Sequence, residues 1–156
     1  LAGTFTDAAG NPNPASSTTN LTIDTVRPTV SSFGSSTADG AHRLGDAIAI
    51  TATMSETVKA GATIVVTLDT GATVTLTRAT AGTTLTGTYT VGASQSTSDL
   101  TVASFTITGV TDNAGNAMTS TTLPATNIAT TKAITVDTLA PLTPGAPTSG
   151  SGWSPR

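Results

Sequence analysis

The sequence contains no cysteine, a single histidine and few aromatic residues, which make up 3% of its 156 residues. Without cysteine there are no disulfides, no thiolate metal sites and no cysteine nucleophiles. Only 10% of the residues are charged, and the six Lys and Arg are spread along the chain. We therefore expect no nucleic-acid partner, because no basic surface is available to neutralise phosphates. No apolar run approaches the about 18 residues of a transmembrane helix, so we expect no membrane insertion.

Threonine is abundant, at about a quarter of all residues, and it is accompanied by 15 Gly and 8 Pro. β-Branched residues favour strands, whereas glycine and proline favour turns and disfavour long helices. Hydrophobic residues reach 37% of the chain, well above the level of disordered sequences. The composition therefore predicts a folded, all-β protein.

Two short phrases each occur twice in the chain. They are Thr-Asp-x-Ala-Gly-Asn, at 6–11 and 111–116, and Ile/Val-Asp-Thr-x-x-Pro, at 23–28 and 136–141. The copies are 105 and 113 residues apart, which is the size of one β-sandwich domain. We therefore expect a tandem array. In it, 1–25 is the C-terminal part of a preceding repeat, 26–138 is one complete repeat, and 139–156 is a Pro/Gly/Ser-rich linker or the start of the next repeat.

Period-two alternation of apolar residues predicts seven strands within the complete repeat. They are centred on 30–33, 48–54, 64–68, 74–76, 85–91, 102–107 and 134–136. A change of phase at Ala103–Ser104 predicts a bulge in the sixth strand. Seven such strands favour an immunoglobulin-like β-sandwich with an aliphatic core, although other seven-stranded sandwiches remain possible. The stretch from Ala38 to Asp46 is interpreted as turns, with His42 as an exposed loop residue.

The two repeated phrases, together with Met54-Ser55-Glu56-Thr57-Val58, resemble the bacterial Ig-like repeats of giant secreted surface adhesins of the RTX or biofilm-associated type. The resemblance covers about 110 residues. It implies an extracellular repeat of a bacterial cell-surface stalk, with neighbouring repeats as partners and calcium often bound between them. The sequence departs from the family at Arg27, where the residue before Pro28 is usually small, and in its long Thr-rich loop at 119–131.

The order of the strands brings acidic residues together. If successive strands alternate in direction, the loops after the second, fourth and sixth strands share one end of the sandwich with the incoming chain. Asp24 lies in that incoming segment, Glu56 follows the second strand, and Asp112 follows the sixth. Carboxylates this close repel one another unless a cation binds between them. The sequence therefore predicts a metal site formed by Asp24, Glu56, Asp112 and Asn116.

Calcium suits this predicted site, because it accepts six to eight oxygen ligands in flexible geometry. Backbone carbonyls near Thr25 and Asn113 could complete its shell, whereas zinc would prefer nitrogen or sulfur. The alternative interpretation is an ordinary turn, in which Asp and Asn side chains bond only to the local backbone. By the same logic, Asp137 and Asp7 belong to sites of the following and preceding repeats.

The remaining acidic residues map to loops at the opposite end of the predicted sandwich. They are Asp39, Asp46, Asp69 and Asp99, and we interpret them as solvated turn residues. The threonine alternation in 73–77 and 84–90 predicts a solvent-facing sheet surface, although similar ladders occur on ice-binding surfaces.

An enzyme is not expected, because the lone His42 has no predicted partner and no Gly-x-Ser-x-Gly sequence occurs. The leading interpretation is a structural stalk repeat of a large secreted adhesin, made rigid by Ca²⁺ at the junction between repeats. A second is a subunit of an extracellular fibre, in which the alternating Leu21 and Ile23 pair with an edge strand of another copy. A third is a carbohydrate- or surface-binding β-sandwich, which the scarcity of aromatic residues disfavours.

Overall fold

The computed structural model describes residues 5–11 and 20–141. Its elements are β1 (Val30–Gly34), β2 (Gly40–His42), β3 (Ala47–Val58), β4 (Thr63–Leu68), β5 (Thr73–Thr77), β6 (Gly82–Thr90), β7 (Val102–Gly109), α1 (Ile128–Thr131) and β8 (Ile134–Val136). This composition of strands with one short helix confirms the predicted all-β class. None of the described helical residues forms a helix long and apolar enough to span a bilayer.

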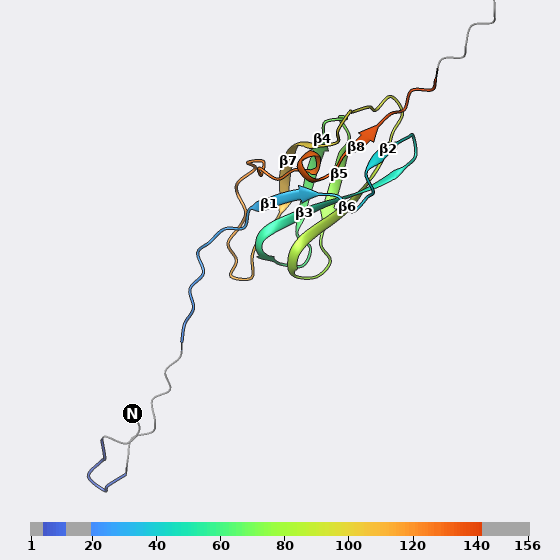
Figure 1. Cartoon of the computed structure of the whole chain (residues 1–156). Coiled ribbons are helices and arrows are strands. Elements are labelled where there is room, and N and C mark those ends of the chain that lie inside the picture. The colour runs from blue at the N-terminus through green and yellow to red at the C-terminus, as the bar shows by residue number, and fades with distance from the viewer. Residues whose placement is uncertain (1–4, 12–19, 142–156) are drawn as a thin grey trace, which may run out of the picture.

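Six strands form one antiparallel sheet in the order β1-β3-β6-β5-β4-β7. The sheet curls until its two edge strands meet through the interior (Figure 1). Phe33 of β1 and Phe105 of β7 make the contact, with ring centroids 5.5 Å apart and planes inclined by 68°, an edge-to-face arrangement that aromatic rings favour. The curled sheet therefore encloses the core on both sides.

Strict alternation along the strands builds this core. In β3 the buried side chains are Ile48, Ile50, Ala52 and Met54, and each is separated from the next by a residue facing outward. The same pattern in β4 buries Ile64, Val66 and Leu68. Burial of apolar surface is the dominant stabilising term in such a fold, and here aliphatic side chains supply most of it, as the sequence predicted.

The outer face of the sheet carries threonines. Thr51, Thr86, Thr77 and Thr63 stand in register across β3, β6, β5 and β4. All four are exposed or half-buried, as the period-two alternation predicted for Thr77 and Thr86. Their β-branched side chains suit a pleated sheet surface, and their hydroxyls remain accessible to water.

The strand β2 was not predicted, because three residues in a turn-rich stretch carry too little alternation to stand out. It forms because β8 pairs with it in parallel, with Ala41 opposite Thr135. His42 is therefore not the exposed loop residue that the sequence suggested. Its side chain is only 16% exposed, its Nε2 atom lies 3.2 Å from the Ala38 carbonyl, and its Nδ1 atom lies 3.7 Å from Asp46.

The register of the sheet shifts at several places, in the pairs of β1 with β3, β3 with β6 and β4 with β7. In β7, Val102 and Ser104 face consecutive residues of β4, so Ala103 is the bulged residue, as the change of phase predicted. In β3, the register with β6 shifts between Thr53 and Val58. The strand nevertheless continues to Val58, and this extension positions the candidate site.

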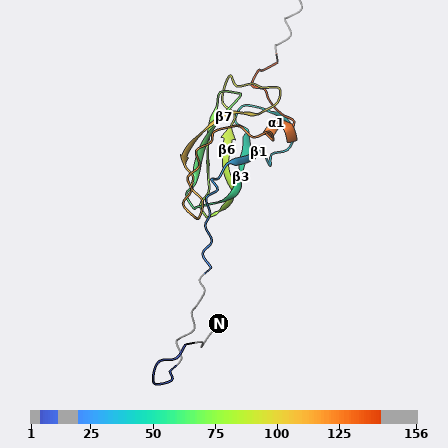
Figure 2. The ribbon, with the colours of Figure 1, turned by 90° about the vertical axis from the view of Figure 1, so that its left-hand side faces the viewer.

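The chain enters and leaves at opposite ends of the molecule (Figures 1 and 2). The segment before β1 arrives at one end, and the segment after β8 departs from the other. Residues 142–156 of the predicted C-terminal linker, and 1–4 and 12–19 of the predicted preceding repeat, lie outside the described residues.

Candidate metal centre

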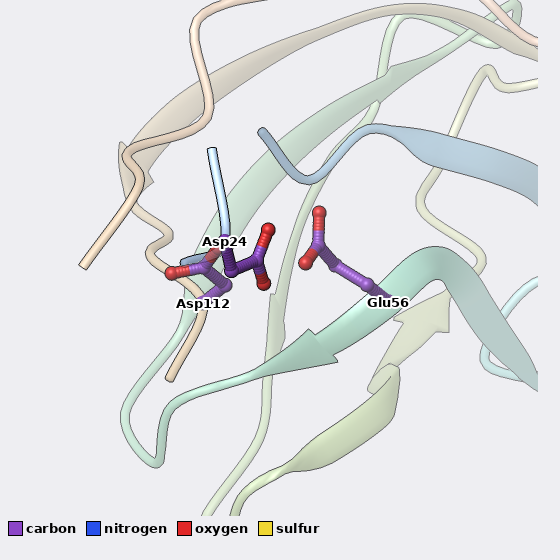
Figure 3. Close-up of side chains that lie close together, drawn as sticks. All are labelled: Asp24, Glu56 and Asp112. Carbon is purple, nitrogen blue, oxygen red and sulfur yellow. The ribbon is translucent and has the colours of Figure 1, made fainter. Parts of the chain in front are cut away.

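Three carboxylates meet at the end of the molecule where the chain enters. Asp24, Glu56 and Asp112 each offer one oxygen atom, and these atoms all lie within 4.8 Å of one another. Figure 3 shows the Glu56 side chain extending from β3 toward the two aspartates. Within residues 5–11 and 20–141, this is the one group of three or more acidic or histidine side chains placed to hold a metal ion. The convergence predicted from strand direction is therefore present in the structure.

Glu56 belongs to β3 and not to the loop after it, where the sequence placed it. It lies between the buried Met54 and Val58 in the alternation of the strand, so its carboxylate is on the inner face of the sheet. The Glu56 Oε1 atom is buried and has no hydrogen-bond partner. Loss of solvent raises the pKa of Glu56, and the negative charges of Asp112 and Asp24 raise it further.

Asp112 is held by its own loop. Its Oδ1 atom accepts hydrogen bonds from the backbone N–H groups of Gly115 (2.6 Å) and Asn116 (2.7 Å). Its Oδ2 atom accepts one from the Asn116 side-chain amide at 2.7 Å. Burial, which leaves the residue 1% exposed, raises the pKa of Asp112, but these hydrogen bonds outweigh burial and hold the pKa below its ordinary value. Asp112 therefore stays ionised beside Glu56.

Asn116 connects the loop to the incoming chain. Its Nδ2 atom donates to the backbone carbonyl of Asp24 at 3.1 Å as well as to the Asp112 carboxylate. The sequence predicted Asn116 as a metal ligand. In the structure, its side-chain amide instead contacts both aspartates and positions them. Asp24 is exposed, and its Oδ1 atom accepts a hydrogen bond from the Val26 N–H at 3.0 Å.

Three further hydrogen bonds fix the incoming chain against the domain, and none of them was predicted from the sequence. The Thr29 N–H donates to the Ser55 hydroxyl at 3.0 Å, while the Ser55 N–H donates to the Thr29 carbonyl at 2.9 Å. The Arg27 guanidinium reaches the Ala117 carbonyl at 3.4 Å. The segment that carries Asp24 is therefore held by both β3 and the loop after β7.

Among the residues that the structure describes, no salt bridge neutralises the site. Salt bridges among the described residues join His42 and Arg43 to Asp46, and Lys132 to Asp39. None of them involves the three clustered carboxylates. Carboxylates a few ångströms apart repel one another strongly where solvent is partly excluded. The cluster could therefore hold a metal ion.

The acidic residues at the opposite end make different kinds of contact. Asp46 accepts a hydrogen bond from the Arg43 N–H three residues earlier, as the interpretation of a turn residue predicts. Asp39 accepts from the Ala133 N–H and Asp69 from Thr97 and Thr101, so these two aspartates join segments that are far apart in sequence. Asp99 differs, because its Oδ1 atom is buried without a hydrogen-bond partner. Asp137 forms no metal-binding group with them in the part of the chain that the structure describes.

The first copy of the Thr-Asp-x-Ala-Gly-Asn phrase folds in the same way as the second. Asp7 Oδ1 accepts from the N–H groups of Ala9 and Asn11, and Asp7 Oδ2 accepts from the Asn11 side chain, each at 2.9 Å. Gly10 and Gly115 both have positive φ, at 85° and 100°. The local turn is therefore present in both copies, and at Asp112 the turn and the carboxylate cluster occur together.

Comparisons of the chain with protein-family models, curated proteins and solved structures found no match. The resemblance to bacterial Ig-like repeats therefore stays a prediction carried by the two repeated phrases.

Proposed function

We propose that this chain is a structural repeat of an extracellular bacterial adhesin stalk, with an immunoglobulin-like fold and a Ca²⁺ ion at its junction with the preceding repeat. The observation that carries the proposal is the carboxylate cluster of Asp24, Glu56 and Asp112. One of its members lies before the domain, and the other two belong to the domain itself. An ion bound there would therefore cross the junction.

The chemistry of the donors favours calcium. All three side chains offer oxygen, and they come from three parts of the chain that are far apart in sequence. Calcium accepts such oxygen sets in flexible geometry, whereas magnesium requires a near-ideal octahedron. The exposed Asp24 leaves room for water to complete the coordination. Sites in extracellular modules commonly bind calcium with dissociation constants of about 10⁻⁴–10⁻³ M, a range matched to the calcium concentration outside cells.

The mechanical effect follows from where Asp24 lies. Only five residues separate it from β1, and hydrogen bonds at Arg27 and Thr29 already restrict this connection. A cation shared by Asp24, Glu56 and Asp112 would add to these hydrogen bonds and to the one from Asn116, and would hold the entering chain more firmly to the end of the sheet. The proposed stalk would therefore be stiffer with calcium than without it.

Calcium titration of the full chain tests this proposal. At about one hundred times the dissociation constant, one ion stabilises the folded state by about 2.7 kcal/mol, which raises Tm by roughly 10 °C in a domain of this size. The Glu56→Gln variant keeps the shape of the side chain and should lose this response. The matched control is Asp7→Asn, which changes the equivalent turn outside the cluster and should respond like the native chain.

A Tm that stays constant from chelator to millimolar calcium would contradict the proposal. Amide hydrogen exchange adds a local readout, because calcium should slow exchange at Val26, whose N–H is bonded to Asp24. Equal slowing in Glu56→Gln would show that the ion binds elsewhere.

A further inference from the structure

The strand that leads into the second repeated phrase is buried in one copy and exposed in the other. Ile134 and Val136 of β8 are 0% and 1% exposed, whereas the equivalent Leu21 and Ile23 are 81% and 76% exposed. Both pairs flank a threonine and precede Asp-Thr. An alternating apolar strand of this kind is stable only where its apolar face is covered. The segment at 20–26 therefore has the sequence of a buried strand but lacks the segments that would pack against it.

The structure shows what those surroundings are in the buried copy. The β8 position, as we call it, lies between β2 and the segment Thr97–Leu100. The Leu100 N–H donates to the Ile134 carbonyl at 2.8 Å, and Thr97 and Val136 exchange two hydrogen bonds of 2.9 Å. On the other side β8 runs parallel to β2. The position therefore supplies backbone partners on both edges of the strand.

The chain after the strand also has the same backbone contact in both copies. The Leu139 N–H donates to Asp137 Oδ1 at 2.9 Å, and the Val26 N–H donates to Asp24 Oδ1 at 3.0 Å. The phrase thus keeps its own turn whether or not the strand before it is paired. Asp24 and Val26 therefore already make the turn hydrogen bond that follows β8 in the buried copy.

Residues 20–26 are far from the β8 position of their own domain. Asp24 belongs to the carboxylate cluster where the chain enters, whereas the Asp137 N–H is bonded to the His42 carbonyl, near the end from which the chain leaves (Figure 1). The few residues between Asp24 and β1 fix the segment at the first end. A strand built from Leu21–Ile23 must therefore pair with another domain.

We propose that Leu21–Ile23 is the closing strand of a second domain of this fold, and that it occupies that domain's β8 position beside its β2 and its Thr97–Leu100 segments. Ile23 is directly followed by Asp24. The strand that completes one domain is then joined without a spacer to a cluster residue of the next. Pairing of the strand requires no metal ion, so it can be tested apart from the proposed calcium site.

Emptying the β8 position in the full chain tests this proposal. The substitutions Ile134→Asp and Val136→Asp place charges on the buried face of β8 and should expel it. Leu21–Ile23 of one copy can then fill the vacant position of the next, and head-to-tail association of this kind produces open oligomers. We expect light scattering to show a mass at least twice that of the native monomer. Adding Leu21→Asp and Ile23→Asp to the same chain should abolish the association.

A peptide experiment covers the case in which the charged variant does not fold. A synthetic peptide of residues 20–27 is added to the milder Ile134→Ala/Val136→Ala chain, and Tm is measured. The peptide should raise Tm, and the same peptide with aspartate at both apolar positions should not. A peptide of residues 133–140 serves as the positive control. The proposal is overturned if that control raises Tm and the 20–27 peptide does not, or if the charged variant folds and stays monomeric.

Discussion

The loops around Asp7 and Asp112 have almost the same sequence and the same hydrogen bonds, yet they differ in what surrounds them. In each loop the aspartate accepts backbone and side-chain hydrogen bonds from the asparagine four residues later. Asp7 is exposed, whereas Asp112 is buried beside Glu56 and Asp24. The difference teaches that the turn is a local property of the phrase, and that the candidate metal site depends on the rest of the fold.

The pKa of both aspartates is lowered, for the same local reason. At Asp7 the main cause is the hydrogen bond from the Asn11 side chain. At Asp112 the hydrogen bonds from the loop must first overcome burial. The loop therefore keeps Asp112 ionised at a place where Glu56 is pushed toward its neutral form.

The largest expected effect is the difference in Tm and in calcium response between substitutions at Asp112 and at Asp7. Asp112→Ala removes the acceptor of three hydrogen bonds in a buried loop and leaves the Asn116 backbone N–H without the acceptor it has in the native chain. We expect the greatest loss of Tm among the variants considered, and a calcium response that falls from roughly 10 °C to zero. Asp7→Ala should leave the Tm of the domain and its calcium response unchanged. Thermal melts with and without calcium make the comparison.

Asp112→Asn refines this comparison. Asparagine can still accept the backbone hydrogen bonds through its side-chain oxygen, but it carries no charge. The variant should keep most of the stability of the fold and lose most of its calcium affinity. A variant that binds calcium as well as the native chain would show that the Asp112 charge is not needed.

The next expected effect concerns the pH dependence of Glu56. Its pKa is raised above the ordinary value of 4.5 in the folded state, so just above that value the folded chain binds more protons than the unfolded chain. Without calcium, the free energy of unfolding should therefore fall as pH rises through this window. Glu56→Gln should lack this fall and melt higher than the native chain in chelator at neutral pH.

Asp112 acts with the opposite sign and in a different window. Its lowered pKa contributes stability that is lost as pH falls below about 3.8, so the two groups can be told apart. Urea denaturation in chelator between pH 3 and pH 7 provides the measurement. If the free energy of unfolding changes with pH in the same way in the native chain and in Glu56→Gln above pH 4.5, the raised pKa does not belong to Glu56.

A smaller effect is expected at the two asparagines. Asn116→Ala removes the side chain that bonds both to the Asp24 carbonyl and to the Asp112 carboxylate. Residues that orient metal ligands typically change affinity by about 10- to 100-fold, and we expect a loss of calcium affinity near the lower limit. Asn11→Ala is the matched control and should not change the affinity. Isothermal titration would measure both.

The smallest effect is expected at the two turn glycines. Gly115 has φ of 100° and Gly10 has φ of 85°, and in both cases a Cβ would have nothing within 4 Å. The cost of alanine is therefore backbone strain alone, about 1–2 kcal/mol. Gly115→Ala should lower the free energy of unfolding by that amount in chemical denaturation. Gly10→Ala should leave it unchanged, because its loop is not part of the folded domain's core.

Much of the fold could be predicted because alternation is a local signal. The buried face of β3 is visible in the spacing from Ile48 to Met54, and the bulge at Ala103 appears as a change of phase. The strand β2 was missed because its only reason to be extended is the parallel pairing with β8. The prediction that His42 is an exposed loop residue was wrong for the same reason.

The three carboxylates were found from the sequence because strand direction alone determines which loops share an end. The position of Glu56 on the inner face was not foreseen, because the strand continues past a register shift that depends on β6. The unpaired Oε1 atom of Glu56 was likewise not predicted, since the neighbouring Asp24 and Asp112 come from two distant segments.

By itself the sequence determined the all-β class, the aliphatic core and the turns of both repeated phrases, because these depend on alternation and on contacts within a few residues. Only the tertiary structure decided that Asp112 is buried while Asp7 of the other copy is exposed, and that Glu56 faces the interior. It also decided that Ile134 and Val136 have partners on both edges, whereas Leu21 and Ile23 are exposed. The physical reason is that burial and charge repulsion depend on which distant segments are packed together, and identical local sequences do not encode that packing.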